Sequence, residues 1–519
     1  MRLATPALIL ALALPAAGRA DEPARSAEKT ITLHQRSRAE TDKGSGRYHT
    51  LTREVKWDGP RTAVVICDMW DKHWCPGATA RVAEMAPRMN QVVAAARKRG
   101  ALVIHCPSDT MEFYKDTPQR KLAQAAPKVE PKVPLQGWCR LDPKKEGALP
   151  IDDSDGGCAE TPKSYRAWAR QVEAIKIEDG DAITDSAEAY YLMRQRGVEN
   201  VIVMGVHTNM CVLGRPFAVR QLTQQGLNVV LMRDMTDTMY NPAKAPFVSH
   251  FTGTDLVVEH IEKHWCPTVT SADLLGGKEF RFKDDRRPHL VVVSAEDEYQ
   301  TEKTLPDFAL KQLGKDFRVS FVFGDARDRN HLPGLEVLDE ADVALVSVRR
   351  RVLPKAEMDL VRKYVASGKP LAGIRTASHA FALPEGQKPP EGTADWPRFD
   401  REVLGCNYAL HHGNKLKTTI KVAQGTEKDP ILAGVKGEFA TTASLYRVLP
   451  LADGAAPLLI GQADGVKQAE PVAWTWKRKD GGRVFCTSLG APADFKEESF
   501  VALLRNGLLW SAGLPIPAP

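Results

Sequence analysis

The chain has 519 residues, of which 43% are hydrophobic and 26% charged, a composition that excludes a disordered or fibrous polymer. Its 71 basic and 65 acidic residues give a net charge of +6 that is spread along the chain. The length predicts more than one domain, with two large domains as the simplest arrangement. The densest basic cluster, Arg349 to Arg351, is interpreted as the start of a solvated helix, so no nucleic-acid partner is expected.

Residues 1–20 have the layout of a secretory signal: Arg2 precedes an apolar stretch that ends in small residues before Asp21. A membrane anchor is the alternative, but Pro6 and Pro15 interrupt a run that is shorter than the roughly 20 residues a span needs. We therefore expect cleavage near Asp21, a periplasmic or secreted location and no stable membrane insertion.

The nine cysteines cannot all pair with one another within one chain, so an oxidising compartment leaves at least one of them free or bonded to another chain. Cys139 and Cys158 flank a loop rich in Pro, Gly and Asp and are the first pair expected. Cys75 and Cys266 lie in two copies of KHWCP and are the second pair considered.

Residues 21–57 are polar with little periodicity, which indicates a tether or an extension of a sheet edge. Apolar, β-branched runs then alternate with helical patterns at the spacing of βαβ units, which favours a parallel sheet covered on both faces. The expected strands are 62–68, 101–107, 198–206 and 227–234, and the expected helices are 82–100, 187–197 and 217–226.

A second alternation starts at residue 289, after a charged segment, 276–288, that we interpret as a linker open to limited proteolysis. Its last third is rich in strands and turn residues, before a final helix at 499–513. The sequence thus predicts two tandem, doubly wound α/β domains with mainly parallel sheets, at 58–275 and 289–519.

Ligands of open α/β sheets bind at the carboxyl ends of the strands, where Asp68, Lys176 and Cys211 are expected. Lys176 is placed there because EAIKIE looks like a short strand. Cys211 could be a nucleophile, a metal ligand or a packed side chain. A thiol at a helix N-terminus near a lysine should have a lowered pKa, which favours the nucleophile.

The segments AVVICDMW, VIVMGVHTNMCVLGRPFAVRQL and GLNVVLMRD resemble the isochorismatase-like cysteine hydrolases, which include nicotinamidases and carbamoyl-amide hydrolases. The resemblance covers residues 58–275. It implies that Cys211 attacks an amide carbonyl, that Asp68 carries the proton and that Lys176 stabilises negative charge.

The same resemblance implies an oxyanion site formed by the backbone N–H groups of His207 and Cys211, and a cis peptide near Val206 and His207. It implies no metal, because His105 and Asp109 do not reproduce the nicotinamidase metal pattern, and no other cofactor is expected. The insertion at about 115–165 would cover the site or an interface.

The segment DMWDKHWC replaces the usual pocket sequence of the family with aromatic and imidazole side chains. These side chains suit a planar or cyclic amide, although the tryptophans could equally pack against the sheet edge. The candidates for substrate contact are Trp70, His73, Trp74, His105 and Asn209.

Residues 289–515 resemble the trehalose-utilisation ThuA-like family, whose fold is that of class I glutamine amidotransferases. The matching segments include GIRTASHAF, DWPRFDREVLGCNYALHHGN and PVAWTWKRKDGGRVFCTSLG. Arg375 to Ala377 occupy the turn where the amidotransferases have a cysteine, so glutaminase chemistry should be absent. The candidates for a carbohydrate site are Thr376, His379, His411 and His412.

Together these features predict a secreted or periplasmic hydrolase that cleaves a C–N bond in a small amide or ureido substrate, with a second domain that binds or processes carbohydrate. One alternative is a binding protein in which both domains have lost turnover. Another is a sugar-processing second domain with a regulatory first domain. Homo-oligomerisation is left open.

Overall fold

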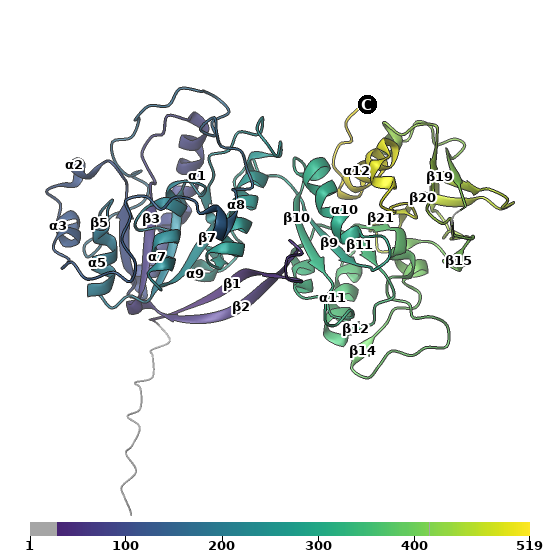
Figure 1. The fold of residues 1–519 in the computed structure, drawn as a ribbon, viewed down its shortest axis with the longest axis horizontal. Helices are drawn as coiled ribbons and strands as arrows, with labels where there is room; N and C mark the ends of the chain where they lie inside the picture. Colours follow the sequence, from purple (N-terminus) through teal and green to yellow (C-terminus); the bar gives the residue numbers. More distant parts are fainter. Residues whose placement is uncertain (1–28, 415, 519) are drawn as a thin grey trace, which may run out of the picture.

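The structure is a computed structural model that describes residues 29–414 and 416–518. Two α/β domains lie side by side along the long axis of the molecule, and a long β-hairpin of the first domain reaches toward the second (Figure 1). The expected signal segment, 1–20, lies outside the described residues. Within the described ranges, no helix is both long and apolar enough to cross a membrane.

The first domain is built on an eight-stranded sheet with the order β2-β1-β8-β7-β6-β3-β4-β5. From β8 to β5 all neighbouring strands are parallel. Their continuous apolar sequences follow from burial on both faces of the sheet. The strands are β1 (Thr30–Glu40), β2 (Tyr48–Asp58), β3 (Thr62–Cys67), β4 (Leu102–Cys106), β5 (Ala182–Ile183), β6 (Asn200–Val206), β7 (Asn228–Asp237) and β8 (Thr268–Val269).

Helices cover both faces of this sheet, and β3 shows why. Val64 and Ile66 belong to the core under α1 and α9, whereas Val65 and Cys67 belong to the core under α5, α7 and α8. The helices are α1 (Pro76–Lys98), α2 (Met111–Tyr114), α3 (Pro118–Gln124), α4 (Pro143–Glu146), α5 (Glu188–Gln195), α6 (Cys211–Gly214), α7 (Val219–Gln224), α8 (His250–His264) and α9 (Ala272–Leu275).

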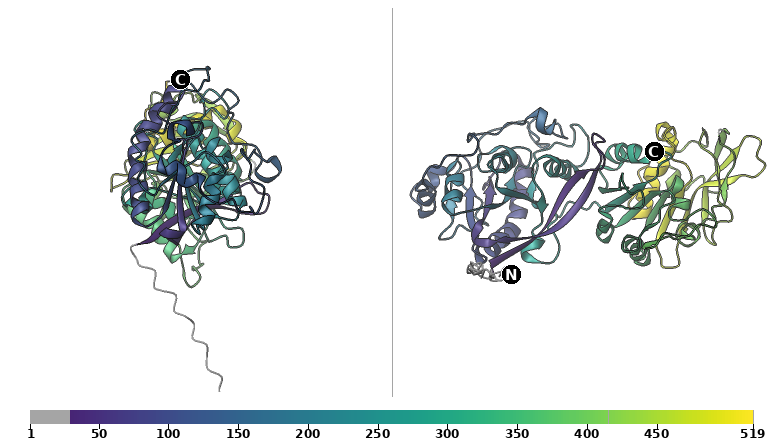
Figure 2. Two further views of the ribbon diagram at one scale, coloured as in Figure 1. Left: turned by 90° about the vertical axis from the view of Figure 1, so that its left-hand side faces the viewer. Right: turned by 60° about the horizontal axis from the view of Figure 1, so that its bottom comes forward.

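The segment expected as a tether or an edge extension forms the hairpin β1–β2 at the edge of the first sheet. β1 pairs with β8 at Arg36 and Thr268. Glu262 of α8 fixes the hairpin, since it accepts hydrogen bonds from Arg36 at 2.7 Å and Arg38 at 2.9 Å. The far end of the hairpin extends beyond the first domain to the second (Figure 2).

The second domain has a nine-stranded sheet with the order β10-β9-β11-β13-β21-β20-β19-β16-β17. The strands from β10 to β21 are parallel and those from β21 to β17 are antiparallel. The antiparallel half corresponds to the strand-rich last third of the sequence. These strands are β9 (His289–Ala295), β10 (Arg318–Phe323), β11 (Val343–Val348), β13 (Leu371–Ile374), β16 (Thr418–Val422), β17 (Glu438–Thr441), β19 (Ala456–Ala463), β20 (Glu470–Lys477) and β21 (Arg483–Thr487).

Helices α10 (Thr301–Phe308), α11 (Lys355–Ala366) and α12 (Glu498–Ala512) pack on this sheet, and two small strand pairs border it, β12 (Leu353–Pro354) with β14 (Thr393–Ala394) and β15 (Leu410–His411) with β18 (Tyr446–Arg447). Arg349 to Arg351 follow β11 and precede β12, so their interpretation as a helix start is wrong. The predicted fold class of two tandem, doubly wound α/β domains is confirmed.

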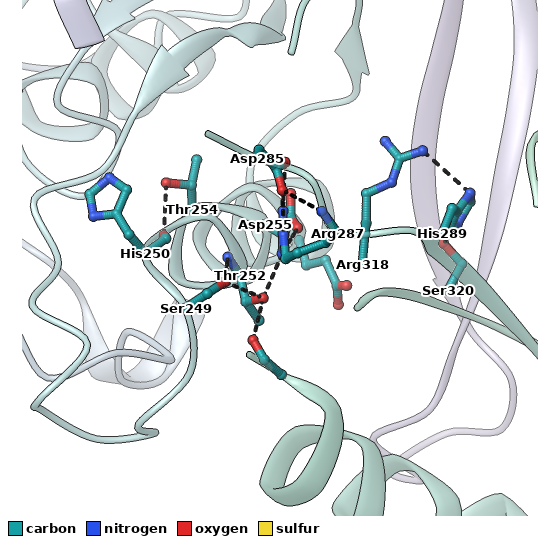
Figure 3. Close-up of polar contacts among 12 residues, drawn as sticks. Ser249, His250, Thr252, Thr254, Asp255, Asp285, Arg287, His289, Arg318 and Ser320 are labelled. Atoms are coloured by element: carbon teal, nitrogen blue, oxygen red, sulfur yellow. Dashed lines mark hydrogen bonds and ion pairs between the residues drawn. The ribbon is translucent and has the colours of Figure 1, made fainter. Parts of the chain in front are cut away.

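The segment expected as a linker, 276–288, lies at the junction between the domains, where about half of its residues are exposed and Arg287 is buried. Arg287 is only 7% exposed and forms ion pairs with Asp285 at 2.7 Å and Asp255 at 3.0 Å (Figure 3). Thr252 of α8 donates a hydrogen bond to the carbonyl oxygen of Gly314 in the second domain, at 2.7 Å. The two domains therefore share a polar interface as well as a connecting peptide.

Candidate active site

Cys211 lies where the sequence predicts it, after the central strand β6 and at the first residue of α6. Its side chain is 8% exposed. The Val206–His207 peptide that precedes it is cis, as the resemblance implied. Because α6 ends at Gly214, ahead of Pro216, the helix behind the thiol is only four residues long.

Asp68 follows β3, the strand beside β6, and is completely buried. One oxygen of its carboxylate, Oδ1, accepts a hydrogen bond from the backbone N–H of Ser108 at 2.8 Å. The other, Oδ2, lies 3.4 Å from Nε of Arg215 and has no hydrogen-bond partner among the described residues. The Cys211 thiol lies against both the Asp68 carboxyl and the Arg215 guanidinium. A thiol, a carboxyl and a guanidinium thus meet at the ends of β3 and β6.

The protonation of this cluster differs from the expectation. Burial and the Asp68 charge raise the pKa of the Cys211 thiol well above its usual value, and Arg215 opposes the rise. Burial also raises the pKa of the Asp68 carboxyl, again against the effect of Arg215. The expected lowering of the thiol pKa is therefore wrong, because a four-residue helix and a single guanidinium do not outweigh burial next to a carboxylate.

Lys176 does not join Asp68 and Cys211. It is exposed, and EAIKIE forms turns instead of a strand, with β5 beginning later at Ala182. The backbone N–H of Lys176 donates to Oδ1 of Asn90 at 2.9 Å, while the charges that act on Cys211 come from Asp68 and Arg215. Arg215 could have been found from its spacing, since it lies four residues after Cys211, one helical turn along the chain.

Aromatic rings stack beside this cluster. Trp70 and Trp168 are parallel with centroids 4.3 Å apart, and His73 continues the stack at 5.8 Å from Trp168. Trp70 also donates a hydrogen bond from Nε1 to the carbonyl oxygen of Ser108 at 3.0 Å, which links the stack to the residue that holds Asp68. Nε1 of Trp168 is buried without a hydrogen-bond partner in the described structure. Trp168 lies just beyond the 115–165 insertion and was not among the site residues expected from the sequence.

Two neutral imidazoles complete this wall. The rings of His73 and His207 meet edge to face at 4.9 Å. Burial lowers the pKa of His73 to about 4, with a further contribution from Arg81. Burial, with His73 next in size, lowers the pKa of His207 to about 3. Nε2 of His207 is buried without a partner among the described residues, so a polar atom of a bound ligand would satisfy it.

Two further candidates are held by other parts of the protein. The ring nitrogens of His105 contact Gln171 at 2.9 Å and Asp181 at 3.1 Å, which leaves none for a substrate. The Asn209 amide donates to Asp153 at 2.7 Å and also bonds the backbone of Met239. His105 therefore packs the core of the domain, and Asn209 fixes part of the insertion next to the site.

The insertion is attached to the site by a disulfide between Cys75 and Cys158, with Cα atoms 5.8 Å apart. Both expected pairs are therefore wrong, and Cys139 and Cys266 are buried free thiols. Sequence spacing could not show that Cys75, at the start of α1, faces the insertion. Trp74 lies beside the disulfide and against Gly156 of the insertion. Glu160 lies near both sulfurs, but sulfurs bonded to each other are not free as thiolates for a metal.

The candidates in the second domain lie at two places. Thr376 and His379 belong to a short 3₁₀ turn, Arg375–His379, directly after β13. His411, in β15, is close enough for its charge to act on His379. His412 turns away, with Nε2 at 3.5 Å from Glu470. The structure thus brings His379 and His411 to one side and leaves His412 with a buried carboxylate.

Comparison with known proteins gave a family match for the second domain and structural similarities for both domains. The family model described as ThuA, trehalose utilisation, matches residues 289–511. No curated protein is similar in sequence to the chain. Among solved structures, a ThuA-like protein from Parabacteroides merdae has 14% identity and a TM-score of 0.32, covering 45% of this chain and 93% of its own.

Two similar structures come from hydrolase families. A cysteine hydrolase from Pseudomonas syringae pv. phaseolicola has 18% identity and a TM-score of 0.28, covering 42% of this chain and 92% of its own. An isochorismatase family protein from Burkholderia thailandensis has 15% identity and a TM-score of 0.25, with 41% and 93% covered. The family model thus matches the predicted second domain at 289–511, which follows an α/β domain whose sequence motifs resemble the isochorismatase-like cysteine hydrolases.

Proposed function

We propose that the first domain hydrolyses a C–N bond of a small amide or ureido substrate. The observation that carries this proposal is the buried cluster of the Cys211 thiol, the Asp68 carboxyl and the Arg215 guanidinium at the carboxyl ends of adjacent parallel strands. Arg215 takes the place that the resemblance gave to Lys176.

In this mechanism Asp68 accepts the thiol proton as sulfur of Cys211 forms a bond to the carbonyl carbon. The oxyanion that develops is stabilised by the backbone N–H groups of His207 and Cys211. Asp68 then returns the proton to the leaving nitrogen as the C–N bond breaks, which leaves a thioester. Water attacks the thioester, Asp68 takes its proton and passes it to the departing sulfur, and the free acid is released.

The high pKa of the Cys211 thiol is compatible with this order of steps, because the proton leaves Cys211 during the attack and not before it. In the reactive state the buried Cys211 thiol and Asp68 carboxyl hold one proton between them. Arg215 keeps the pair in its singly protonated, anionic state, since its charge lowers the pKa of both groups. The stack of Trp70 and Trp168 would offer a flat face to a planar amide.

The test is ammonia or amine release from a library of amides and ureido compounds. Cys211→Ala should reduce turnover of any substrate found by on the order of 10⁴-fold or more. Cys266→Ala, which removes another buried free thiol of the same domain, should retain turnover. Full turnover by Cys211→Ala would show that this cysteine is not the nucleophile.

The alternative is a first domain that binds a small molecule without turning it over. A compound that binds the wild-type protein and Cys211→Ala equally, and is recovered unchanged from both, would favour that alternative.

We also propose a periplasmic or secreted location, which rests on the signal-like layout of residues 1–20. The mass of the protein recovered from the producing cell should correspond to a chain that starts near Asp21. Recovery of intact Met1 in a membrane fraction would contradict this location.

A further inference from the structure

The carboxyl ends of β9, β11 and β13 meet at one edge of the second sheet, in the other domain from Cys211. In the order β10-β9-β11-β13, the strand that follows β9 in the chain, β10, lies on one side of β9, and the next strand, β11, lies on the other side. In open α/β sheets such a reversal creates the crevice in which ligands bind. The segments that follow these strands are 296–300, 349–351 and 375–379.

Arg375 is a buried cation without a carboxylate partner among the described residues. It is 2% exposed, and its guanidinium lies 4.4 Å from the ring centre of Tyr299 and 4.2 Å from that of Tyr446. Its hydrogen bonds go to the carbonyl oxygens of Ser444 and Ser488 and to the hydroxyls of Ser444 and Tyr299, which are all neutral. Its Nε has no hydrogen-bond partner in the described part of the chain. A buried charge is costly unless an opposite charge accompanies it.

Arg350 lies next to this group and also lacks an ion pair within the described residues. Its backbone N–H donates to the carbonyl oxygen of His379 at 3.0 Å, and its guanidinium donates to a backbone carbonyl oxygen at 3.2 Å. By contrast, Arg349 and Arg351 lie 3.3 and 3.4 Å from Asp297. Two guanidiniums at this edge therefore form no ion pair with a carboxylate of the described residues.

His379 lies between these arginines and stays neutral. Burial lowers its pKa to about 3, and the charges of Arg350, Arg349 and Arg375 add to the effect. Its ring stacks on half-buried Tyr408 with centroids 4.3 Å apart. The edge thus combines uncompensated positive charge with aromatic faces and a neutral imidazole, a combination suited to a polar ring that carries an anion.

We propose that this edge of the second domain binds a sugar-sized molecule through an anionic group, a carboxylate or a phosphate. Arg350 contacts the anion, and buried Arg375 adds positive potential from behind it. The ring of the ligand lies against Tyr408 and His379. The negative charge goes beyond the general carbohydrate expectation for this domain, and the site is independent of Cys211.

Isothermal titration calorimetry of the full chain with glucuronate, glucose 6-phosphate and glucose tests this proposal. At least one of the two anions should bind about tenfold or more tightly than glucose, and added salt should weaken that binding. Tighter binding of glucuronate identifies a carboxylate site, and tighter binding of glucose 6-phosphate identifies a phosphate site.

Arg350→Gln should remove the preference for the anion. Arg398→Gln is the matched control, because Arg398 is an exposed arginine of the same domain, paired with Glu402, and should keep the preference. Equal binding of glucose, no binding of either anion, or an unchanged preference in Arg350→Gln would overturn the proposal. Cys211→Ala should bind the anions normally, which separates this test from the test of hydrolysis.

Discussion

The first-domain cluster contains Arg215 where the resemblance implied Lys176, because of the two only Arg215 lies beside Asp68 and Cys211. Lys176 lies before the two-residue strand β5 and is exposed to solvent. Arg215 follows Cys211 by one helical turn. A guanidinium is always charged and presents several donors, so it can face a thiolate and a carboxylate together.

The assignment of the cation gives the first prediction. Arg215→Met should lower kcat/KM by about 100-fold or more, since it removes the positive charge that faces the reacting pair. Lys176→Met should leave kcat/KM unchanged, because Lys176 is exposed and contacts neither Asp68 nor Cys211. Steady-state kinetics on one substrate measures both, and a large loss in Lys176→Met alone would restore lysine to the mechanism.

The second prediction concerns pH. The pair of Asp68 and Cys211 reacts with one proton, so kcat/KM should rise through the first pKa of the pair and fall through the second. Both values are raised, which places the acid limb above 3.8 and the alkaline limb above 9.0, the ordinary values of the two groups. Alkylation of Cys211 by iodoacetamide should follow the alkaline limb. Rapid alkylation at neutral pH would contradict this protonation.

Site residues at the ends of strands could be predicted from the sequence, whereas site residues positioned by a loop could not. Asp68 and Cys211 were predictable because a continuous apolar run shows where each parallel strand stops. Trp168 was not, since it comes from a segment without periodicity whose path depends on tertiary contacts. His105 was placed in the site, but it lies within β4, and its partners Gln171 and Asp181 lie far away in sequence.

Among the elements, the insertion at 115–165 contains a completely buried carboxylate, that of Glu146. Glu146 ends α4, is completely buried as a side chain, and accepts hydrogen bonds from Arg220 at 2.8 Å, His260 at 2.9 Å and Trp265 at 2.8 Å. These partners belong to the neighbourhood of α7 and α8, so Glu146 joins the insertion to the helical face of the domain.

The third prediction is the effect of removing that charge. Glu146→Gln should lower the free energy of unfolding by about 3–5 kcal/mol, because Arg220 would remain buried without its partner. Glu130→Gln, an exposed change in the same insertion, should have little effect. Chemical denaturation of both variants measures the difference, and equal stabilities would mean that the insertion is held by other contacts.

The same carboxylate gives the fourth prediction, in acid. Burial alone would raise its pKa, but the hydrogen bonds from His260, Arg220 and Trp265 lower it to about 2, from an ordinary value of 4.5. A lowered pKa stabilises the fold above 4.5, and that stabilisation is lost as the pH falls from 4.5 toward 2. The wild-type protein should therefore lose more stability than Glu146→Gln over this range, which pH-dependent denaturation would show.

The regular elements of the α/β core were largely predictable, whereas three irregular features were not. EAIKIE was taken for a strand because it alternates apolar and charged residues, yet Gly180 and the turns around it end any pairing. The sequence of the hairpin β1–β2 is compatible with either a tether or a sheet-edge extension, since most of its side chains are polar. It forms an edge because buried Ile31 and Leu33 pack into the core of the domain and because Arg36 and Arg38 form ion pairs with Glu262.

For the whole molecule, the charged segment that suggested a flexible connection is part of the interface. Arg287 binds Asp285 within the segment and Asp255 of α8, and Glu279 pairs with Arg318 of the second domain. Charge in a sequence therefore does not by itself separate a linker from a polar domain junction.

The fifth prediction follows from this interface. Arg287→Gln should loosen the attachment of residues 276–288 to both domains, so trypsin should cut the variant there much sooner than the wild-type chain. Thermal unfolding of the variant should separate into two transitions, whereas the wild-type domains should unfold closer together. Arg286→Gln, which changes the neighbouring arginine, is the control. Rapid cutting of the wild-type chain within the segment would contradict a packed junction.

The pairing of β1 with β8 has a consequence for the order in which the chain is synthesised. β1 is made first, yet its partner across the sheet at Thr268 follows Arg36 by more than two hundred residues. The N-terminal hairpin must therefore wait, unpaired on that side, until nearly all of the first domain has left the ribosome. A domain that closes its sheet with its earliest strand cannot finish folding while it is still being made.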